Sequence, residues 1–130
     1  LVIKEVKSGY TATYQLEKKT VMNWVFRKTG IWARIYGDNA GRYEEVIAAL
    51  PADMQKKMTA SRDCKRLIDP DACSGTCVKG FVYSLNGETQ KKCRNDGMLF
   101  LLTEETAEYI AGLICAEVAV RKLALQQLNR

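Results

Sequence analysis

The segment TVMNWVFRKTGIWARIY, residues 20–36, decides the fold of this chain. On each side of Thr29-Gly30 the side chains divide into two alternating sets, which is typical of strands in an antiparallel sheet. Glycine adopts positive φ at little cost, so Thr29-Gly30 predicts a tight turn between strands over residues 20–28 and 31–36. The alternation over residues 10–16, followed by the polar turn 17–19, adds a third strand. We therefore expect an antiparallel β-meander.

The rest of the chain predicts helices and a second hairpin. Apolar residues recur at helical spacing over residues 42–50 and 51–60, and Asp38 or Asn39 is placed to cap the first of these helices. Asn86-Gly87 predicts a hairpin between strands over 81–85 and 88–94, and another strand covers 98–102. Strands and helices are segregated, so we expect one α+β domain over residues 1–130, with the meander and the second hairpin packed against helices.

A long C-terminal helix is predicted from a cap at Thr103 to about residue 128. Its middle is apolar on nearly all sides, and a helix of this kind is buried on most sides. Two interpretations remain open: the helix packs into the sheet, or it forms part of a homodimer interface. Glu117 and Arg121 are spaced to form an i,i+4 ion pair, and Cys115 is expected in the core.

Three of the five cysteines lie in a loop predicted over residues 61–80, and Cys93 lies at the far end of the hairpin that follows. Their spacing is Cys64-x8-Cys73-x3-Cys77-x15-Cys93. Four thiolates suit a structural Zn²⁺, which usually takes one pair of ligands two to four residues apart, as in Cys73 and Cys77. A loop of this length is uncommon unless it is tied down or functional. We therefore expect a structural zinc site.

Three other interpretations of the cysteines compete with zinc. The thiols can be inert packing residues, because cysteine is among the most often buried residue types. They can form disulfides, which require an oxidising compartment. Alternatively, Cys64 and Cys93 are redox-sensitive thiols, because their cationic neighbours lower a thiol pKa.

The net charge of +5 is local to the same region. Residues 56–94 contain nine basic and four acidic residues, whereas the rest of the chain is balanced. Such a block favours an acidic partner such as nucleic acid. It is also consistent with a solvated face, or with positive charge that offsets bound thiolates.

A candidate ligand face lies on the predicted meander. Aromatic residues interleaved with arginines stack on and neutralise a nucleotide or a single strand of nucleic acid. The alternative is a half-covered sheet face on which arginines pack over the aromatic rings. The face consists of Asn23, Arg27, Trp32, Arg34 and Tyr36.

Motifs for catalysis are missing from the sequence. The chain has no histidine, which removes Ser-His and Cys-His arrangements and the usual general base at neutral pH. It contains no P-loop, no GxGxxG after a strand and no GxSxG. No apolar run reaches the roughly 18–20 residues that span a bilayer, and we expect a cytoplasmic protein without a membrane partner. These features favour a small non-enzymatic binding or accessory domain.

Two runs carry a resemblance to known proteins. Residues 24–39, WVFRKTGIWARIYGDN, and residues 64–70, CKRLIDP, with the Cys73/Cys77 pair, resemble small bacterial proteins of unknown function. The order of a meander, a helix, a hairpin and a final helix is similar to the YdhG-like α+β fold, from whose general pattern the cysteine loop departs. The resemblance implies a bacterial origin and a sheet packed against helices. It implies no activity and no site residue.

Overall fold

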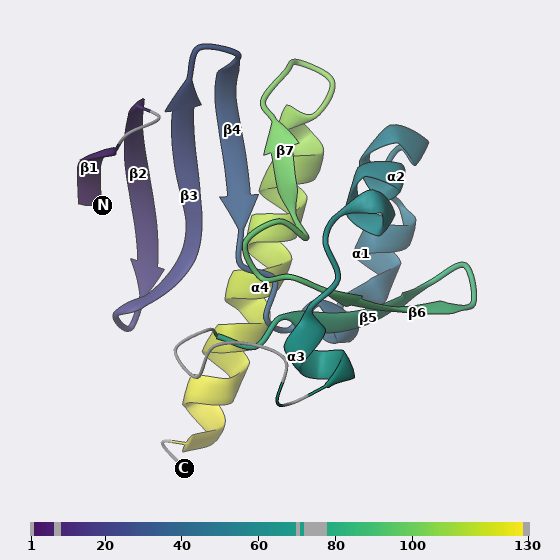
Figure 1. The fold of residues 1–130 in the computed structure, drawn as a ribbon. Coiled ribbons are helices and arrows are strands. Elements are labelled where there is room, and N and C mark those ends of the chain that lie inside the picture. Colours follow the sequence, from purple (N-terminus) through teal and green to yellow (C-terminus); the bar gives the residue numbers. More distant parts are fainter. Residues whose placement is uncertain (1, 7–8, 70, 72–77, 129–130) are drawn as a thin grey trace.

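The computed structural model describes residues 2–6, 9–69, 71 and 78–128, which form an α+β fold (Figure 1). This confirms the predicted fold class. The main sheet is antiparallel, with five strands in the order β1-β2-β3-β4-β7. Its strands are β1 (Val2–Val6), β2 (Gly9–Leu16), β3 (Lys19–Arg27), β4 (Gly30–Ile35) and β7 (Leu99–Leu101). Strand β1 extends the predicted meander at its edge and was not foreseen, since residues 1–8 have no clear period.

The register of the meander gives the sheet one apolar face. Met22 is opposite Ile35 and Trp24 is opposite Ala33, so these residues share a face. Gly30, with φ of 131°, begins β4 after the tight turn, a conformation that favours glycine. The alternating pattern therefore predicted the strands, whereas burial does not follow the alternation, since Val21 and Val25 on the opposite face are buried as well.

Between β4 and β7 the chain builds the second half of the domain, beyond the β7 edge of the sheet (Figure 1). Asn86 and Gly87 both have positive φ and form the hairpin turn that the sequence predicts. The predicted loop at residues 61–80 was wrong in part, because it contains a short helix. The elements in this half are η1 (Ala40–Arg42), α1 (Glu44–Ala48), α2 (Ala52–Ala60), α3 (Lys65–Ile68), β5 (Phe81–Leu85) and β6 (Glu88–Lys92).

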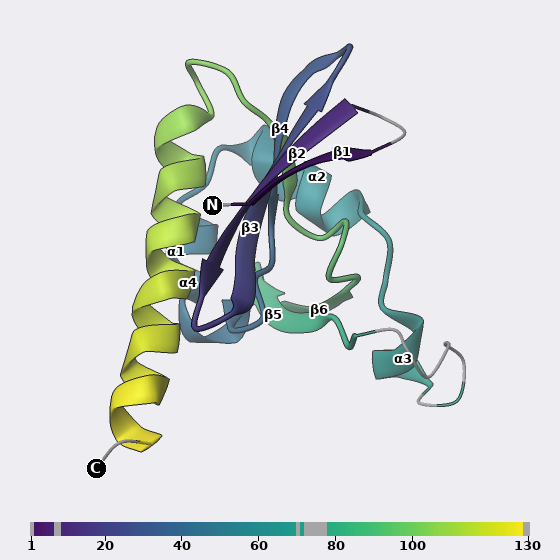
Figure 2. The same ribbon diagram turned by 90° about the vertical axis from the view of Figure 1, so that its left-hand side faces the viewer.

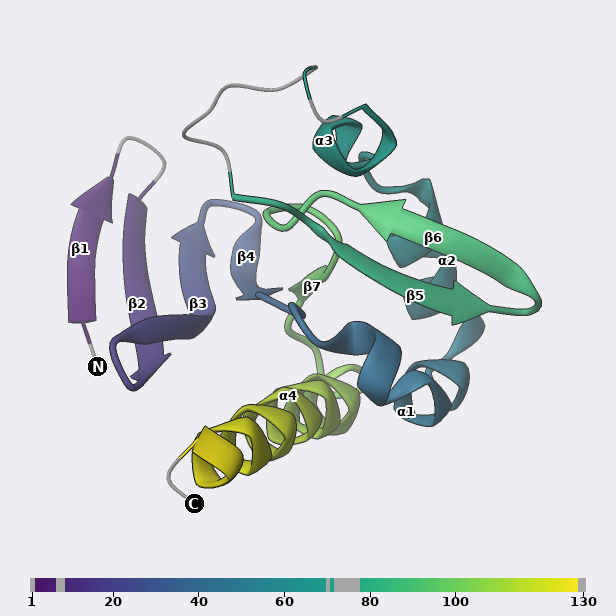
Figure 3. The ribbon, with the colours of Figure 1, turned by 90° about the horizontal axis from the view of Figure 1, so that it is seen from below.

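The long helix α4 (Ala107–Leu128) lies along one face of the main sheet (Figures 2 and 3). Ile110 and Leu113 of α4 join a core that also includes Met22 and Phe100 of the sheet and Tyr83 of the hairpin. In the described part of the chain, no helix is long and apolar enough to cross a membrane.

Two expectations about side chains were wrong. Cys115 is exposed, because α4 turns Ile110, Leu113 and Glu117 toward the sheet and Cys115 away from it. A helix that is apolar on all sides does not reveal from its pattern which side is buried. The predicted helix cap is also not formed: Asn39 directs its side chain to Glu117 instead of to the start of η1.

Candidate functional site

Cys64 and Cys93 are brought together by an isolated antiparallel bridge between Asp63 and Lys92. The N–H groups of Cys64 and Cys93 each donate to a carbonyl of the opposite segment, at 2.9 and 2.8 Å. Side chains alternate along such a pair, so the two cysteines lie on the side opposite to Asp63 and Lys92. They are diagonal neighbours on that side.

This diagonal geometry suits a shared metal better than a direct bond. Diagonal neighbours in an antiparallel pair lie about 7–8 Å apart. Disulfides usually join residues whose Cα atoms are about 4.4–6.8 Å apart. Two sulfurs on one tetrahedral Zn²⁺, each at about 2.3 Å from the metal, are about 3.8 Å apart and require no bond between them. Two thiolates in a diagonal pair are thus of a kind that can share a Zn²⁺.

The Cys64 sulfur is held as a hydrogen-bond acceptor. Its residue is only 6% exposed, and the Gly80 N–H donates to Sγ at 3.3 Å. Burial raises the pKa of the thiol, but the N–H groups of Gly80, Leu67 and Arg66, together with the Arg66 charge, lower it more. The net pKa of Cys64 lies below its ordinary value. The thiolate is the form that binds metals, and N–H donors to sulfur are its usual outer-shell partners.

Gly80 is where the chain returns from the cysteine loop to the hairpin. A Cβ atom at Gly80 would lie 1.9 Å from the Lys92 carbonyl oxygen and 2.9 Å from Cys64 Cβ. Only glycine allows the backbone to pass this closely. The loop thus begins at Cys64 and comes back against it. The other two predicted zinc ligands, Cys73 and Cys77, lie outside the described residues.

Part of the positive charge around this site is buried and hydrogen-bonded within the fold. Lys92 is buried, and its Nζ atom donates to the Thr59 and Ser61 carbonyls and to Asp63 Oδ1, at 2.7–3.1 Å. This lysine therefore fastens the end of α2 to β6 instead of facing a partner. Within the residues that the structure describes, no group of three cysteines or carboxylates is close enough to hold a metal ion.

The candidate ligand face lies on the side of the sheet away from α4. The register pairs Asn23 with Arg34 and places Trp32 and Arg27 on the same face, while Tyr36 follows at the end of β4. Asn23 Nδ2 donates to the Tyr36 hydroxyl at 3.0 Å, and Asn23 Oδ1 is buried without a hydrogen-bond partner in the described structure. The five predicted residues therefore share one face, with Asn23, Arg34 and Tyr36 near one end of the β3–β4 pair and Arg27 at the other.

Both aromatic rings on this face already carry a cation. Lys57 Nζ lies 4.6 Å from the Trp32 ring centroid, and the Arg94 guanidinium lies 4.1 Å from that of Tyr36. Arg34 Nε donates to the Asn95 carbonyl at 3.0 Å. The arrangement matches the alternative in which cations pack over rings within the fold.

A buried polar network, which the sequence did not predict as a whole, joins α4 to the loop after β4. The Glu117 carboxylate is fully buried and accepts hydrogen bonds from the Asn39 N–H and side chain, the Tyr43 hydroxyl and Arg121 Nε, at 2.7–3.0 Å. Burial and then the Glu117 charge raise the pKa of Tyr43 well above its usual range. Asp38 accepts a further hydrogen bond from Arg121 at 3.2 Å. Because these groups satisfy one another's hydrogen-bonding capacity, we assign a structural role to the network.

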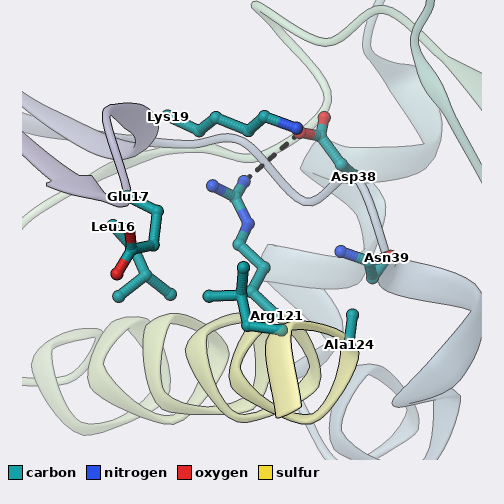
Figure 4. A pocket seen from close by; sticks show the side chains of 8 residues that line it. Leu16, Glu17, Lys19, Asp38, Asn39, Arg121 and Ala124 are labelled. Carbon is teal, nitrogen blue, oxygen red and sulfur yellow. Dashed lines mark hydrogen bonds and ion pairs between the residues drawn. The ribbon is translucent and has the colours of Figure 1, made fainter. Parts of the chain in front are cut away.

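A cavity of about 420 Å³ opens beside this network (Figure 4). The Arg121 side chain reaches from α4 toward Asp38, and Leu16, Lys19 and Asn39 line the same opening. Arg121 also donates to the carbonyl oxygen of Thr20 at the start of β3 and to that of Tyr36 just after β4, each at 2.9 Å. Its guanidinium is thus occupied by internal partners, and the cavity carries no chemistry that we can assign.

Among the residues that surround the Cys64 sulfur, Gly80 is the one that the sequence could have pointed to, because glycine allows a close approach of backbone. The N–H donors of Arg66 and Leu67 come from the turn into α3, which has no signature in the pattern.

Comparison with known proteins assigns no relative to this fold or site. No protein-family model, no curated protein and no solved structure matches the chain. The resemblance to small bacterial proteins and to the YdhG-like fold therefore stays a prediction. The function has to be argued from the geometry of the site.

Proposed function

We propose that this chain is a small non-enzymatic binding or accessory domain whose cysteine loop is pinned by a structural Zn²⁺. Its ligands would be Cys64, Cys73, Cys77 and Cys93. The observation that carries the proposal is the setting of Cys64, where a backbone N–H donates to a sulfur of lowered pKa directly beside the returning loop. A packing thiol needs none of these features.

The position of Cys93 supports the same assignment. The bridge between Asp63 and Lys92 holds the backbones of Cys64 and Cys93 next to each other before any metal binds, which would lower the entropy cost of forming the site. Cys73 and Cys77 would then supply the other two ligands of the zinc. Binding energy at a structural zinc site is folding energy, so the metal would order the loop.

A pinned loop would also fix the neighbouring surface. The Cys93 carbonyl accepts hydrogen bonds from the N–H groups of Asp96 and Gly97, which closes a turn. That turn presents the Asn95 carbonyl to Arg34 and the Arg94 side chain to Tyr36. We therefore expect the zinc to stiffen a surface that includes part of the sheet face, as suits a binding module.

Metal content of the untagged chain, purified under reducing conditions without chelator, tests this proposal. We expect about one zinc per chain by elemental analysis. Cys64→Ser and Cys93→Ser should each lose most of the metal, while the matched control Cys115→Ser should keep it, because Cys115 is exposed on α4. A metal-free wild type, or full retention in the Cys64→Ser/Cys93→Ser double variant, would overturn the proposal.

A thiol redox protein is the second candidate, favoured by the lowered pKa of Cys64. It predicts a metal-free chain in which part of the thiolate forms below the pH at which an ordinary thiol ionises, and in which Cys64→Ser removes that part of the titration. If zinc is bound, the metal should instead protect Cys64, and chelation should restore its reactivity.

Nucleotide or nucleic-acid binding is the third candidate, favoured by the placement of Asn23, Arg27 and Arg34 on one sheet face, where Asn23 Oδ1 has no hydrogen-bond partner among the described residues. It predicts binding of a single-stranded oligonucleotide that weakens steeply with salt, because phosphate contacts release counterions. Arg27→Ala should reduce that binding. Absence of any binding at low salt would exclude this candidate.

A further inference from the structure

The outer face of α4 carries an unusual set of exposed residues. We define it as Glu108, Ala111, Cys115, Ala119 and Lys122, all of which are exposed. The buried residues Ile110, Leu113 and Glu117 lie on the opposite side of the helix, and in the described part of the chain no other element lies on the outer side of α4 (Figure 2). An exposed helix face is ordinarily polar along its length. Here the three central positions are small and apolar, and the two charged residues stand at the ends.

Gly112 borders this face and is not explained by packing within the chain. A glycine inside a helix costs about 1 kcal/mol relative to alanine. A Cβ atom added at Gly112 would have no atom of the described residues within 4 Å, so none of these neighbours requires a glycine here. Close approach of the backbone of another protein chain would explain why this position has no side chain.

We propose that the outer face of α4 binds the same face of a second copy of the chain, with the two helices antiparallel about a two-fold axis at Cys115. In such a pair, each residue n positions after Cys115 faces the residue n positions before it in the partner copy. Ala119 then faces Ala111, and Lys122 faces Glu108. The face is self-complementary in both size and charge.

Charge is what selects an antiparallel second copy over other occupants. Glu108 and Lys122 are each seven residues from Cys115, about 10 Å along the helix axis. A parallel pair would set Glu108 against Glu108 and Lys122 against Lys122. Among the residues that the structure describes, neither side chain takes part in an ion pair. In an antiparallel pair, Glu108 of each copy faces Lys122 of the other copy, which gives two ion pairs per dimer.

Sedimentation velocity of the full chain over about 1–500 μM, in reducing buffer at low salt, tests the proposal. We expect a monomer–dimer equilibrium for the wild type. Glu108→Lys and Lys122→Glu should each weaken it by about tenfold or more, because each turns two attractions into two repulsions. The double variant Glu108→Lys/Lys122→Glu should restore it, which also shows that the single variants fail for reasons of charge and not of folding.

Oxidation of the dimer provides a second readout. Cys115 would face itself across the axis, so mild oxidation should give a covalent dimer that Cys115→Ser cannot form. A wild type that is monomeric throughout the range would overturn the proposal. So would a dimer that the single charge reversals leave unchanged.

Discussion

Replacing Glu117 with glutamine tests how α4 is fixed to the sheet. Both carboxylate oxygens accept two hydrogen bonds: Oε1 from the Asn39 N–H and the Tyr43 hydroxyl, and Oε2 from Asn39 Nδ2 and Arg121 Nε. Glutamine has nearly the same shape but presents an NH₂ group in place of one oxygen. At the Oε2 position that group faces two N–H donors and both hydrogen bonds are lost; at the Oε1 position the bond from the Asn39 N–H is lost, while the Tyr43 hydroxyl can turn to accept.

The size of the effect follows from these losses. Each hydrogen bond to a charged group contributes about 1.5–3 kcal/mol, and breaking a buried ion pair by removing one partner costs about 3–5 kcal/mol. Glu117 is fully buried and Arg121 nearly so, so solvent replaces neither group. We expect Glu117→Gln to lower the free energy of unfolding by about 3–5 kcal/mol. For a chain of this size, the melting temperature should fall by about 10–20 °C.

Urea unfolding followed by tryptophan fluorescence and circular dichroism measures this change. Glu105→Gln, at an exposed carboxylate just before α4, is the matched control and should change stability by less than about 1 kcal/mol. The Tyr43 pKa should also fall in Glu117→Gln, while burial keeps it above its ordinary value. A loss of stability no larger than that of the control would refute the view that this network holds α4 in place.

Three further substitutions test the β5–β6 hairpin and the backbone around Cys64 and Cys93. Gly80→Ala should lower stability and metal content together, because its Cβ would collide with the Lys92 carbonyl, whereas Gly112→Ala, with open space around it, should lower neither; equal effects in a melting curve would contradict this. Lys92→Met should cost about 2–4 kcal/mol in urea unfolding by removing a buried ammonium from three oxygens, against little change for the exposed neighbour Lys91→Met. Burial raises the pKa of Tyr83 to about 12, so the unfolded chain ionises first and stability that is complete below pH 10 is lost as pH rises toward 12. Tyr83→Phe lacks this ionisation and removes a hydroxyl without a described partner, so its stability relative to wild type should be equal or higher at pH 7 and should increase further by pH 11; a constant difference would be inconsistent with this reasoning.

The sequence predicted the parts of the fold that depend on local patterns. The alternation over residues 10–36 and the Asn86-Gly87 turn specify strands and hairpins through side-chain period and backbone preference alone. It could not predict that β7 pairs with β4, because Ala33 and Phe100 meet only after some 60 intervening residues have folded. Nor could it orient α4, whose inward side includes the charged Glu117.

The candidate site shows the same division. The spacing of Glu117 and Arg121 predicted their ion pair, which is confirmed at 2.8 Å, but not the arrival of Asn39 from 78 residues away. The cysteine count and the CxxxC pair pointed to zinc, whereas the N–H donor at Gly80 depends on how two distant segments cross. Residue types and short spacings can therefore be interpreted from the sequence, whereas contacts between distant segments that complete a site depend on the topology of the fold.

The intact mass of the untagged chain, measured first under native and then under denaturing conditions, tests the zinc-pinned loop most directly. We expect a native mass higher than that of the reduced chain by one zinc, and loss of that excess on acidification. A native mass equal to that of the bare reduced chain would contradict it. A mass lower by two hydrogens per bond, without metal, would contradict it as well and would identify disulfides in place of thiolate ligands.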